Sequence, residues 1–152
     1  MDALTDRPLT LPPLRERQAM PAHAPQGQAL VFDSSTLILF LNDALPEDAA
    51  EVLNESVHAG LASISAIVRA EVLAWGEHTA ASLTAAPALL DVCHLVPVSA
   101  AIADEAARIR RETGLKLPDA LIAATALLQR ATLVTANGRD FRRVPDLGLI
   151  ET

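Results

Sequence analysis

The sequence predicts an α/β protein, a three-layer α/β/α sandwich built on a mainly parallel central sheet. Short apolar runs of strand length alternate with longer helical segments, a pattern typical of parallel sheets with helices on both faces. Of the 152 residues, 51% are hydrophobic and only 3% are aromatic. A chain of this length can bury a substantial core in one domain, and we expect that core to be aliphatic.

The first 28 residues differ from the rest of the chain. Five prolines lie among polar and charged residues without any periodicity, namely Pro8, Pro12, Pro13, Pro21 and Pro25. This composition predicts an extended or disordered tail over residues 1–28 and a folded domain over 29–152. An alternative is that translation starts at Met20.

The first strand leads into two helices. Apolar residues 29–32 predict a buried strand that ends at Asp33, and the small polar residues 34–36 are good N-caps for a helix over 37–42. A second helix is expected over 46–59, because a proline begins it, two acids lie in its first turn and a glycine follows it.

The second strand, predicted over residues 61–64, precedes a helix with one unusual residue. In the helix predicted over 65–75, Glu71 lies in the middle of an apolar face. That face consists of Ile64, Ile67, Val68, Val72 and Trp75. A carboxylate in such a place is unfavourable unless it is paired, protonated or bound to a cation. An arginine partner is the ordinary alternative.

The remaining segments complete the alternation of strands and helices. We expect a weaker helix over 79–91 that a proline interrupts, a strand over 93–98, and a helix over 99–113 with an Asp104–Arg108 pair on its outer face. After one further helix, residues 131–135 predict a fourth strand, and Leu149 and Ile150 are expected to add a short last one.

The helix predicted over 117–128 is the most distinctive element. Pro118 suits its first position, and Asp119 lies in its first turn. The residues that follow show no polar face, which predicts a helix packed on all sides. A carboxylate at the start of a buried helix suggests that it faces a bound cation.

Composition excludes several classes of function. The net charge is −7, which gives no general basic surface for nucleic acid, although a cation bound by clustered acids cancels their charge locally. The single cysteine, Cys93, excludes an intrachain disulfide and fits a reducing cytoplasm. No histidine has ligand spacing to another histidine or to the cysteine, and no apolar run reaches the ~20 residues of a membrane span.

Four acids stand out by their positions, although each alone has an ordinary explanation. Asp33 can cap a helix, Asp119 can complement a helix dipole, and Asp140 can be a loop acid after the fourth strand. Together with Glu71 they make a stronger case, because clustered carboxylates repel unless protons or cations intervene. Mg²⁺ or Mn²⁺ is the natural cation for such ligands, and it can activate water for phosphodiester hydrolysis.

The same acids lie in four segments that resemble the motifs of the PIN domain, especially in ribonuclease toxins of the VapC type. The segments occur in the order of the family, at residues 30–38, 64–73, 117–126 and 133–141. The third matches best. The leader lies outside this pattern, and Ser35 stands where asparagine is common in the family.

This resemblance implies a Mg²⁺- or Mn²⁺-dependent endoribonuclease, usually a homodimer, that an antitoxin protein encoded beside it inhibits. It implies a metal-binding catalytic quartet of Asp33, Glu71, Asp119 and Asp140, of which Asp140 occupies the most variable position. It also implies that polar groups orient the carboxylates or water. These groups are Ser35, Thr135 and Asn137.

An acidic site needs local cations to hold RNA. Arg139, Arg142 and Arg143 flank Asp140 in the sequence, and Arg69 lies near Glu71, so we expect these four to contact phosphates. A solvated basic turn is the alternative. Such contacts do not determine which RNA is cleaved.

Two other hypotheses compete with the ribonuclease. One is a PIN-like fold that serves as an RNA-binding or structural module with little or no catalysis. The other is a different metal-using α/β protein, a receiver or a haloacid-dehalogenase phosphatase. The only lysine, Lys116, precedes the last strands, where a receiver needs one after them, and Ser35 stands where the phosphatase needs a second aspartate.

Overall fold

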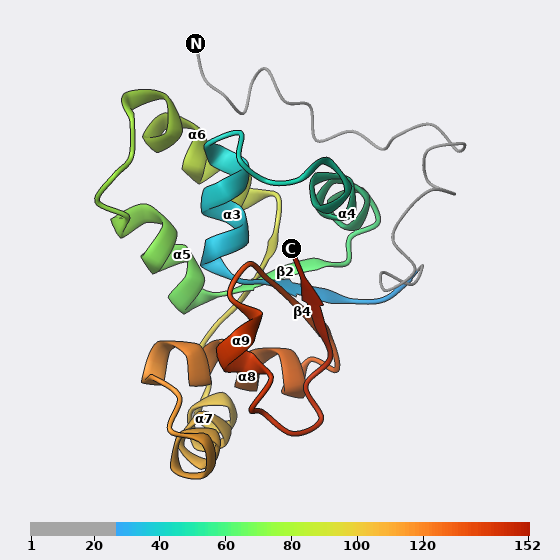
Figure 1. The fold of residues 1–152 in the computed structure, drawn as a ribbon, viewed down its shortest axis with the longest axis vertical. Coiled ribbons are helices and arrows are strands. Elements are labelled where there is room, and N and C mark those ends of the chain that lie inside the picture. The colour runs from blue at the N-terminus through green and yellow to red at the C-terminus, as the bar shows by residue number, and fades with distance from the viewer. Residues whose placement is uncertain (1–26) are drawn as a thin grey trace.

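A five-stranded, all-parallel sheet forms the centre of the protein in the computed structural model, which describes residues 27–152 (Figure 1). The strands are β1 (Leu30–Phe32), β2 (Ala62–Ser65), β3 (His94–Val96), β4 (Thr132–Thr135) and β5 (Leu149–Glu151). The predicted three-layer architecture is confirmed. The predictions for the N-terminal tail and for a start at Met20 concern residues that lie outside the described part, apart from positions 27 and 28.

Seven helices cover this sheet within residues 27–152. They are α3 (Ser34–Leu41), α4 (Glu47–His58), α5 (Ala66–Ala74), α6 (Ala80–Asp91), α7 (Ala100–Thr113), α8 (Leu117–Leu128) and α9 (Gly138–Phe141). Figure 1 shows α3, α4 and α6 on one side of the sheet and α7 and α8 on the other. None of these helices has the length and apolar character needed to cross a bilayer.

The strand order, β3-β2-β1-β4-β5, places a switch point in the middle of the sheet. The chain leaves β1 towards β2 on one side, whereas β4 lies on the other side of β1 and continues towards β5. In open parallel sheets, ligands bind beyond the carboxyl ends of the strands where the order reverses. The segments that follow β1 and β4 therefore meet where a ligand is expected.

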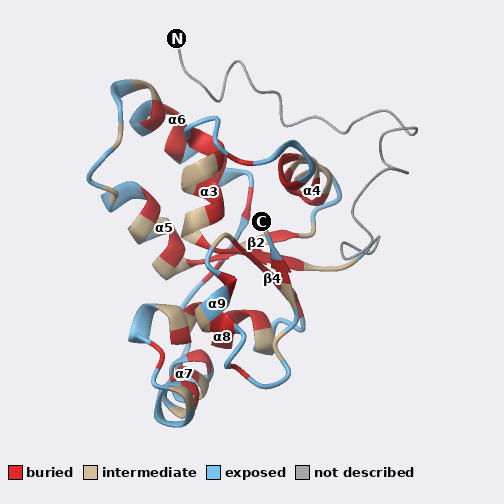
Figure 2. Cartoon of the chain, in the orientation of Figure 1, coloured by how far each residue is buried: buried red, intermediate tan, exposed pale blue. Residues whose placement is uncertain are grey.

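The core is mainly aliphatic, as the composition predicts, although all three phenylalanines are buried in it, and it continues from the sheet into the helices (Figure 2). Helix α8 packs on β1, β2 and β4, and its middle residues, from Ile122 to Ala126, are buried. The ends of this helix differ from the prediction, since Leu117 and Leu128 are 51% and 47% exposed. Burial is thus concentrated in the middle turns of α8.

Several local details correct the sequence predictions. The N-cap of α3 is Asp33, not one of residues 34–36, because its carboxylate accepts the Ser34 amide. Helix α6 continues through Pro87 without a break. On α7, Arg108 pairs with Glu105 and Glu112, not with Asp104, so two other acids on the same helix satisfy its guanidinium.

Candidate active site

Asp33 is the fixed point of the candidate site. It follows β1 directly, and its side chain is only 4% exposed. Oδ1 accepts from the Ser34 amide at 2.7 Å and from the Ser34 hydroxyl at 3.3 Å. Oδ2 accepts from the Ser35 hydroxyl at 3.0 Å and from the Thr135 hydroxyl at 2.7 Å. Hydrogen bonds to both oxygens hold this buried carboxylate in a single orientation.

The loop after β4 fixes the two hydroxyl groups that donate to Asp33 Oδ2. The Ala136 amide donates to Ser35 Oγ at 3.1 Å, and the Asn137 amide donates to Thr135 Oγ1 at 2.9 Å. Each hydroxyl oxygen thus accepts from a backbone amide, while its proton is directed to the carboxylate. Ser35 and Thr135 both donate to Asp33, and their role in supporting a metal ligand stays a prediction. Asn137 contributes through its backbone, and its side chain is exposed.

Ser34 joins the first acid to the second, a link that the sequence analysis missed. The Ser34 hydroxyl has one proton, which it shares between Asp33 Oδ1 at 3.3 Å and Glu71 Oε1 at 3.1 Å. Glu71 lies on α5 between the buried residues Val68 and Val72, and it is itself partly exposed. In the sequence, Ser34 is distinguished only by its place next to Asp33 and by its inclusion in the first PIN-like segment, and neither indicates a bond to Glu71.

The ionisation of Glu71 reflects this environment. Burial raises the pKa of Glu71, and the negative charges of Asp33 and Asp119 raise it further, while the hydrogen bond from Ser34 acts in the opposite direction. The pKa of Glu71 therefore responds to the charges of two of the other acids that the sequence analysis selected.

Asp119, in the first turn of α8, joins the same group of charges. Burial raises the pKa of Asp119, and the charges of Asp33 and Asp140 add to this effect, while Lys116 opposes it. All four predicted acids are thus linked by electrostatic repulsion. We call Asp33, Glu71, Asp119 and Asp140 the carboxylate cluster.

The donor chemistry of the carboxylate cluster fits a hard divalent cation, since every candidate ligand is a carboxylate oxygen. The geometry is less complete, because within residues 27–152 no three acidic, histidine or cysteine side chains are already arranged to hold a metal ion.

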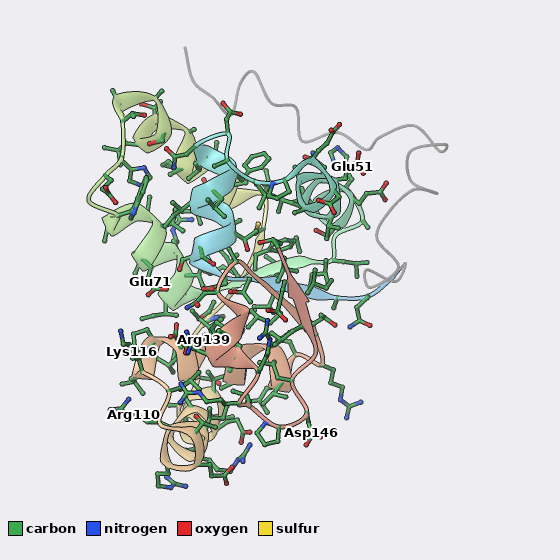
Figure 3. All side chains as sticks on the ribbon, viewed as in Figure 1. Glu51, Glu71, Arg110, Lys116, Arg139 and Asp146 are labelled. Carbon is green, nitrogen blue, oxygen red and sulfur yellow. The ribbon has the colours of Figure 1, made fainter. Side chains whose placement is uncertain are left out.

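The four predicted RNA-binding arginines lie in different environments. Arg69 is paired with Asp91 at 2.9 Å, and Arg142 forms a two-bond ion pair with Glu151. Arg143 donates to the Thr113 carbonyl at 2.9 Å and lies 3.7 Å from Asp140. Only Arg139 is exposed with no protein partner among the hydrogen bonds and ion pairs that the structure gives for the described residues (Figure 3).

Lys116 is a further cation near the cluster, and the sequence analysis used it only to exclude a receiver. It is exposed, and its charge acts on Asp119, three residues further along the chain. Nucleophilic catalysis by cysteine has no support here, because burial raises the pKa of Cys93 to about 12 and its thiol stays protonated.

Comparison with known proteins identifies the fold that carries this site. The model of the PIN domain family matches residues 30–147, which include all four acids. The chain belongs to the PIN domain family. The resemblance inferred from the four sequence segments is thereby confirmed, and the match extends from β1 to the residues before β5.

Several solved structures are similar to this PIN domain, and one of them is a toxin–antitoxin complex. A toxin–antitoxin complex from Klebsiella pneumoniae is 30% identical, with a TM-score of 0.63 over 80% of this chain and 96% of that one. VapBC2 from Rickettsia felis, bound to a promoter DNA fragment, is 25% identical, with a TM-score of 0.66 over 82% and 98%. DNA-bound VapBC from Salmonella typhimurium, 22% identical with a TM-score of 0.71 over 82% and 98%, supports the fold. No curated protein matched the chain.

Proposed function

We propose that this PIN domain is a Mg²⁺- or Mn²⁺-dependent endoribonuclease, the toxin of a toxin–antitoxin pair. The observation that carries the proposal is the carboxylate cluster at the switch point of the sheet, where burial and mutual repulsion raise the pKa of Glu71 and of Asp119. Acids arranged so that they resist ionisation are characteristic of functional sites. A bound divalent cation relieves this repulsion.

In the proposed mechanism, the four acids have different roles. Asp33 is the preoriented ligand, because hydrogen bonds to both of its oxygens fix it before any cation arrives. Glu71, Asp119 and Asp140 complete the ligand set by side-chain rotation. The cation, when bound, activates water and stabilises the leaving oxygen of the phosphodiester. Hydrolysis then needs no nucleophilic side chain from the protein.

The RNA backbone is held by cations at the edge of the cluster. Arg139 and Lys116 are exposed and close in sequence to Asp140 and Asp119, so they are the strongest candidates for phosphate contacts. Arg69, Arg142 and Arg143 already have acceptors in the protein, and their proposed part is long-range attraction of the RNA.

Two partners belong to this proposal. The structural neighbours from Klebsiella pneumoniae and Rickettsia felis belong to toxin–antitoxin systems, which supports an antitoxin protein as the inhibitor of this chain. A homodimer is the proposed assembly, as expected for toxins of this family. Light scattering of the purified protein, alone and with its antitoxin, tests both.

One observation favours a second candidate, an RNA-binding or structural PIN module with little catalysis. Within the described residues, no group of three or more potential ligands is preassembled for a metal ion. If the side-chain rotations required of Glu71 and Asp119 do not occur, the fold can still bind RNA without cutting it.

Cleavage of a mixed RNA pool separates the two candidates. Purified protein is incubated with EDTA, with Mg²⁺ and with Mn²⁺, beside the Asp33→Asn/Asp119→Asn variant. The ribonuclease predicts cleavage that needs the metal and falls by about 100-fold or more in the variant, as expected when preorganised electrostatic groups are removed. RNA binding without cleavage supports the second candidate, and cleavage that persists in the variant indicates a contaminant.

A further inference from the structure

The last described strand reaches back to the helix that carries Asp140. Glu151, at the end of β5, accepts from Arg142 Nε at 3.0 Å through Oε2, and its Oε1 accepts from the Arg142 guanidinium as well. Arg142 follows α9 directly as its C-cap, and its backbone amide donates to the Gly138 carbonyl. The ion pair therefore ties the end of β5 to the helix that carries Asp140.

Gly138, the first residue of α9, shows how closely the Glu151 side chain lies against this helix. A Cβ atom added at Gly138 would overlap Glu151 Oε1 and Cγ. Any larger residue at this position would therefore displace the Glu151 side chain, and the glycine leaves room for it. Glu151 thus covers the start of α9 while it binds the residue at the end of the helix.

The backbone of Glu151 is tied to the same site. In the parallel pairing of β4 with β5, Thr135 is the partner of Glu151, and the Thr152 amide donates to the Thr135 carbonyl at 3.0 Å. Thr135 in turn donates its hydroxyl proton to Asp33. Glu151 is therefore fixed next to Thr135, which binds Asp33, and its side chain also holds the segment that bears Asp140.

We infer that Glu151 is a positioning residue, which acts through Arg142 and Gly138 to hold α9 so that Asp140 can join the other metal-binding carboxylates. We call Glu151, Arg142 and Gly138 the α9 clamp. This inference deepens the proposed function and rests on it for the role of Asp140. It also assigns Arg142 a purpose other than contact with RNA.

The chain contains a matched control for the clamp. On α7, Arg108 Nε donates to Glu105 Oε2 at 3.1 Å, and the Arg108 guanidinium also bonds Glu105 Oε1. This pair has the same two-bond geometry, but both residues lie on one helix, and α7 carries none of the carboxylate cluster. Glu105→Gln removes a similar ion pair without touching α9.

Mn²⁺ titration of the apo protein by calorimetry tests the inference. Glu151→Gln and Gly138→Ala are each expected to weaken Mn²⁺ binding by about tenfold, the lower end of the range for groups that support metal ligands. Glu105→Gln is expected to leave it unchanged. Because Glu151 acts through Asp140, Glu151→Gln is expected to cause no further loss in an Asp140→Asn background. Unchanged affinity in Glu151→Gln, or an equal loss in both backgrounds, would overturn the inference.

Amide hydrogen exchange of the apo protein provides a readout that needs neither metal nor RNA. The Arg142 amide and its neighbours at the end of α9 are expected to exchange faster in Glu151→Gln and in Gly138→Ala than in wild type or Glu105→Gln. Unchanged exchange there would overturn the clamp, even in a protein that binds Mn²⁺. A wild-type protein that neither binds Mn²⁺ nor cleaves RNA contradicts the proposed function, whereas the exchange experiment still decides the clamp.

Discussion

Asp33 and Asp119 belong to one carboxylate cluster, but the chain holds them in different ways. Asp33 is buried at the end of a strand, and hydroxyl and amide donors engage both of its oxygens. Asp119 lies half-buried at the start of α8, where burial and its neighbours' charges raise its pKa. The orientation of the strand-borne acid is fixed without a cation, whereas the charge of the helix-borne acid stays unfavourable until a cation binds.

This difference assigns separate tasks to the two parts of the site. In the proposed metal site, Asp33 would fix the position of the cation, and Glu71, Asp119 and Asp140 would complete its ligands. Repulsion among the carboxylates lowers the stability of the apo protein, and a bound cation relieves this repulsion. A cation that binds only the folded state also stabilises that state by mass action. Stability and metal affinity are thus expected to change in opposite directions at the helix-borne acids.

The sharpest test replaces each aspartate with asparagine. Both Asp33→Asn and Asp119→Asn are expected to abolish metal-dependent cleavage. In the apo protein, Asp33→Asn is expected to lower the free energy of unfolding by about 1–3 kcal/mol, because an amide cannot accept from all the donors around it. Asp119→Asn is expected to preserve or raise it. Urea denaturation measures both, and equal destabilisation by the two variants would contradict the comparison.

Thr135→Val tests how far the fixed orientation of Asp33 depends on the Thr135 hydroxyl. The valine keeps the shape but removes the 2.7 Å hydrogen bond to Asp33 and leaves the Asn137 amide without its acceptor. We expect a loss of about 10–100-fold in cleavage, as for other groups that orient metal ligands. Single-turnover cleavage over a range of Mn²⁺ concentrations measures this effect. Wild-type rates at all metal concentrations would show that Asp33 needs no such support.

Glu71→Gln tests whether charge on the helix-borne acids destabilises the apo protein, through the pH dependence of its stability. Burial and neighbouring charges raise the pKa of Glu71 in the folded state above its ordinary value of 4.5. Ionisation of Glu71 therefore opposes folding once the pH rises above 4.5. At neutral pH the glutamine variant is therefore expected to be more stable than the apo wild type, by about 0.5–1 kcal/mol for partly exposed charges. This advantage is expected to disappear below pH 4.5, where wild-type Glu71 is protonated in both states. Thermal unfolding in EDTA across this range measures it, and an advantage that does not change with pH would contradict the electrostatic explanation.

Two of the four acids stood out in the sequence because they conflict with a local pattern, whereas Asp33 and Asp140 were selected through the resemblance of their segments to the PIN motifs. Glu71 lies in the middle of an apolar helical face, and Asp119 opens the apolar helix α8. Such conflicts between a residue and its local pattern are expected at functional sites. They are visible in one sequence because helical periodicity is a short-range property.

The partners of polar side chains were harder to predict, because they depend on which distant segments meet. Arg142 and Arg143 follow Asp140 and appeared to be free to bind RNA. The structure pairs Arg142 with a residue of β5 and Arg143 with the end of α7. The bridge from Ser34 to Glu71 likewise joins residues 37 positions apart. No local pattern in the sequence reports contacts of this kind.

The hydrogen bond between Thr135 and Asp33 also has a consequence for the newly made protein. These residues are 102 positions apart in the chain, yet their strands are neighbours in the sheet. A ribosome therefore makes Asp33 long before the strand that completes its surroundings, and the intervening chain has neither β4 nor α9. The carboxylate cluster, and with it the proposed ribonuclease activity, cannot form until the second half of the domain has been made. For the proposed toxin, this leaves an interval in which the proposed antitoxin can bind the chain before it can cleave RNA.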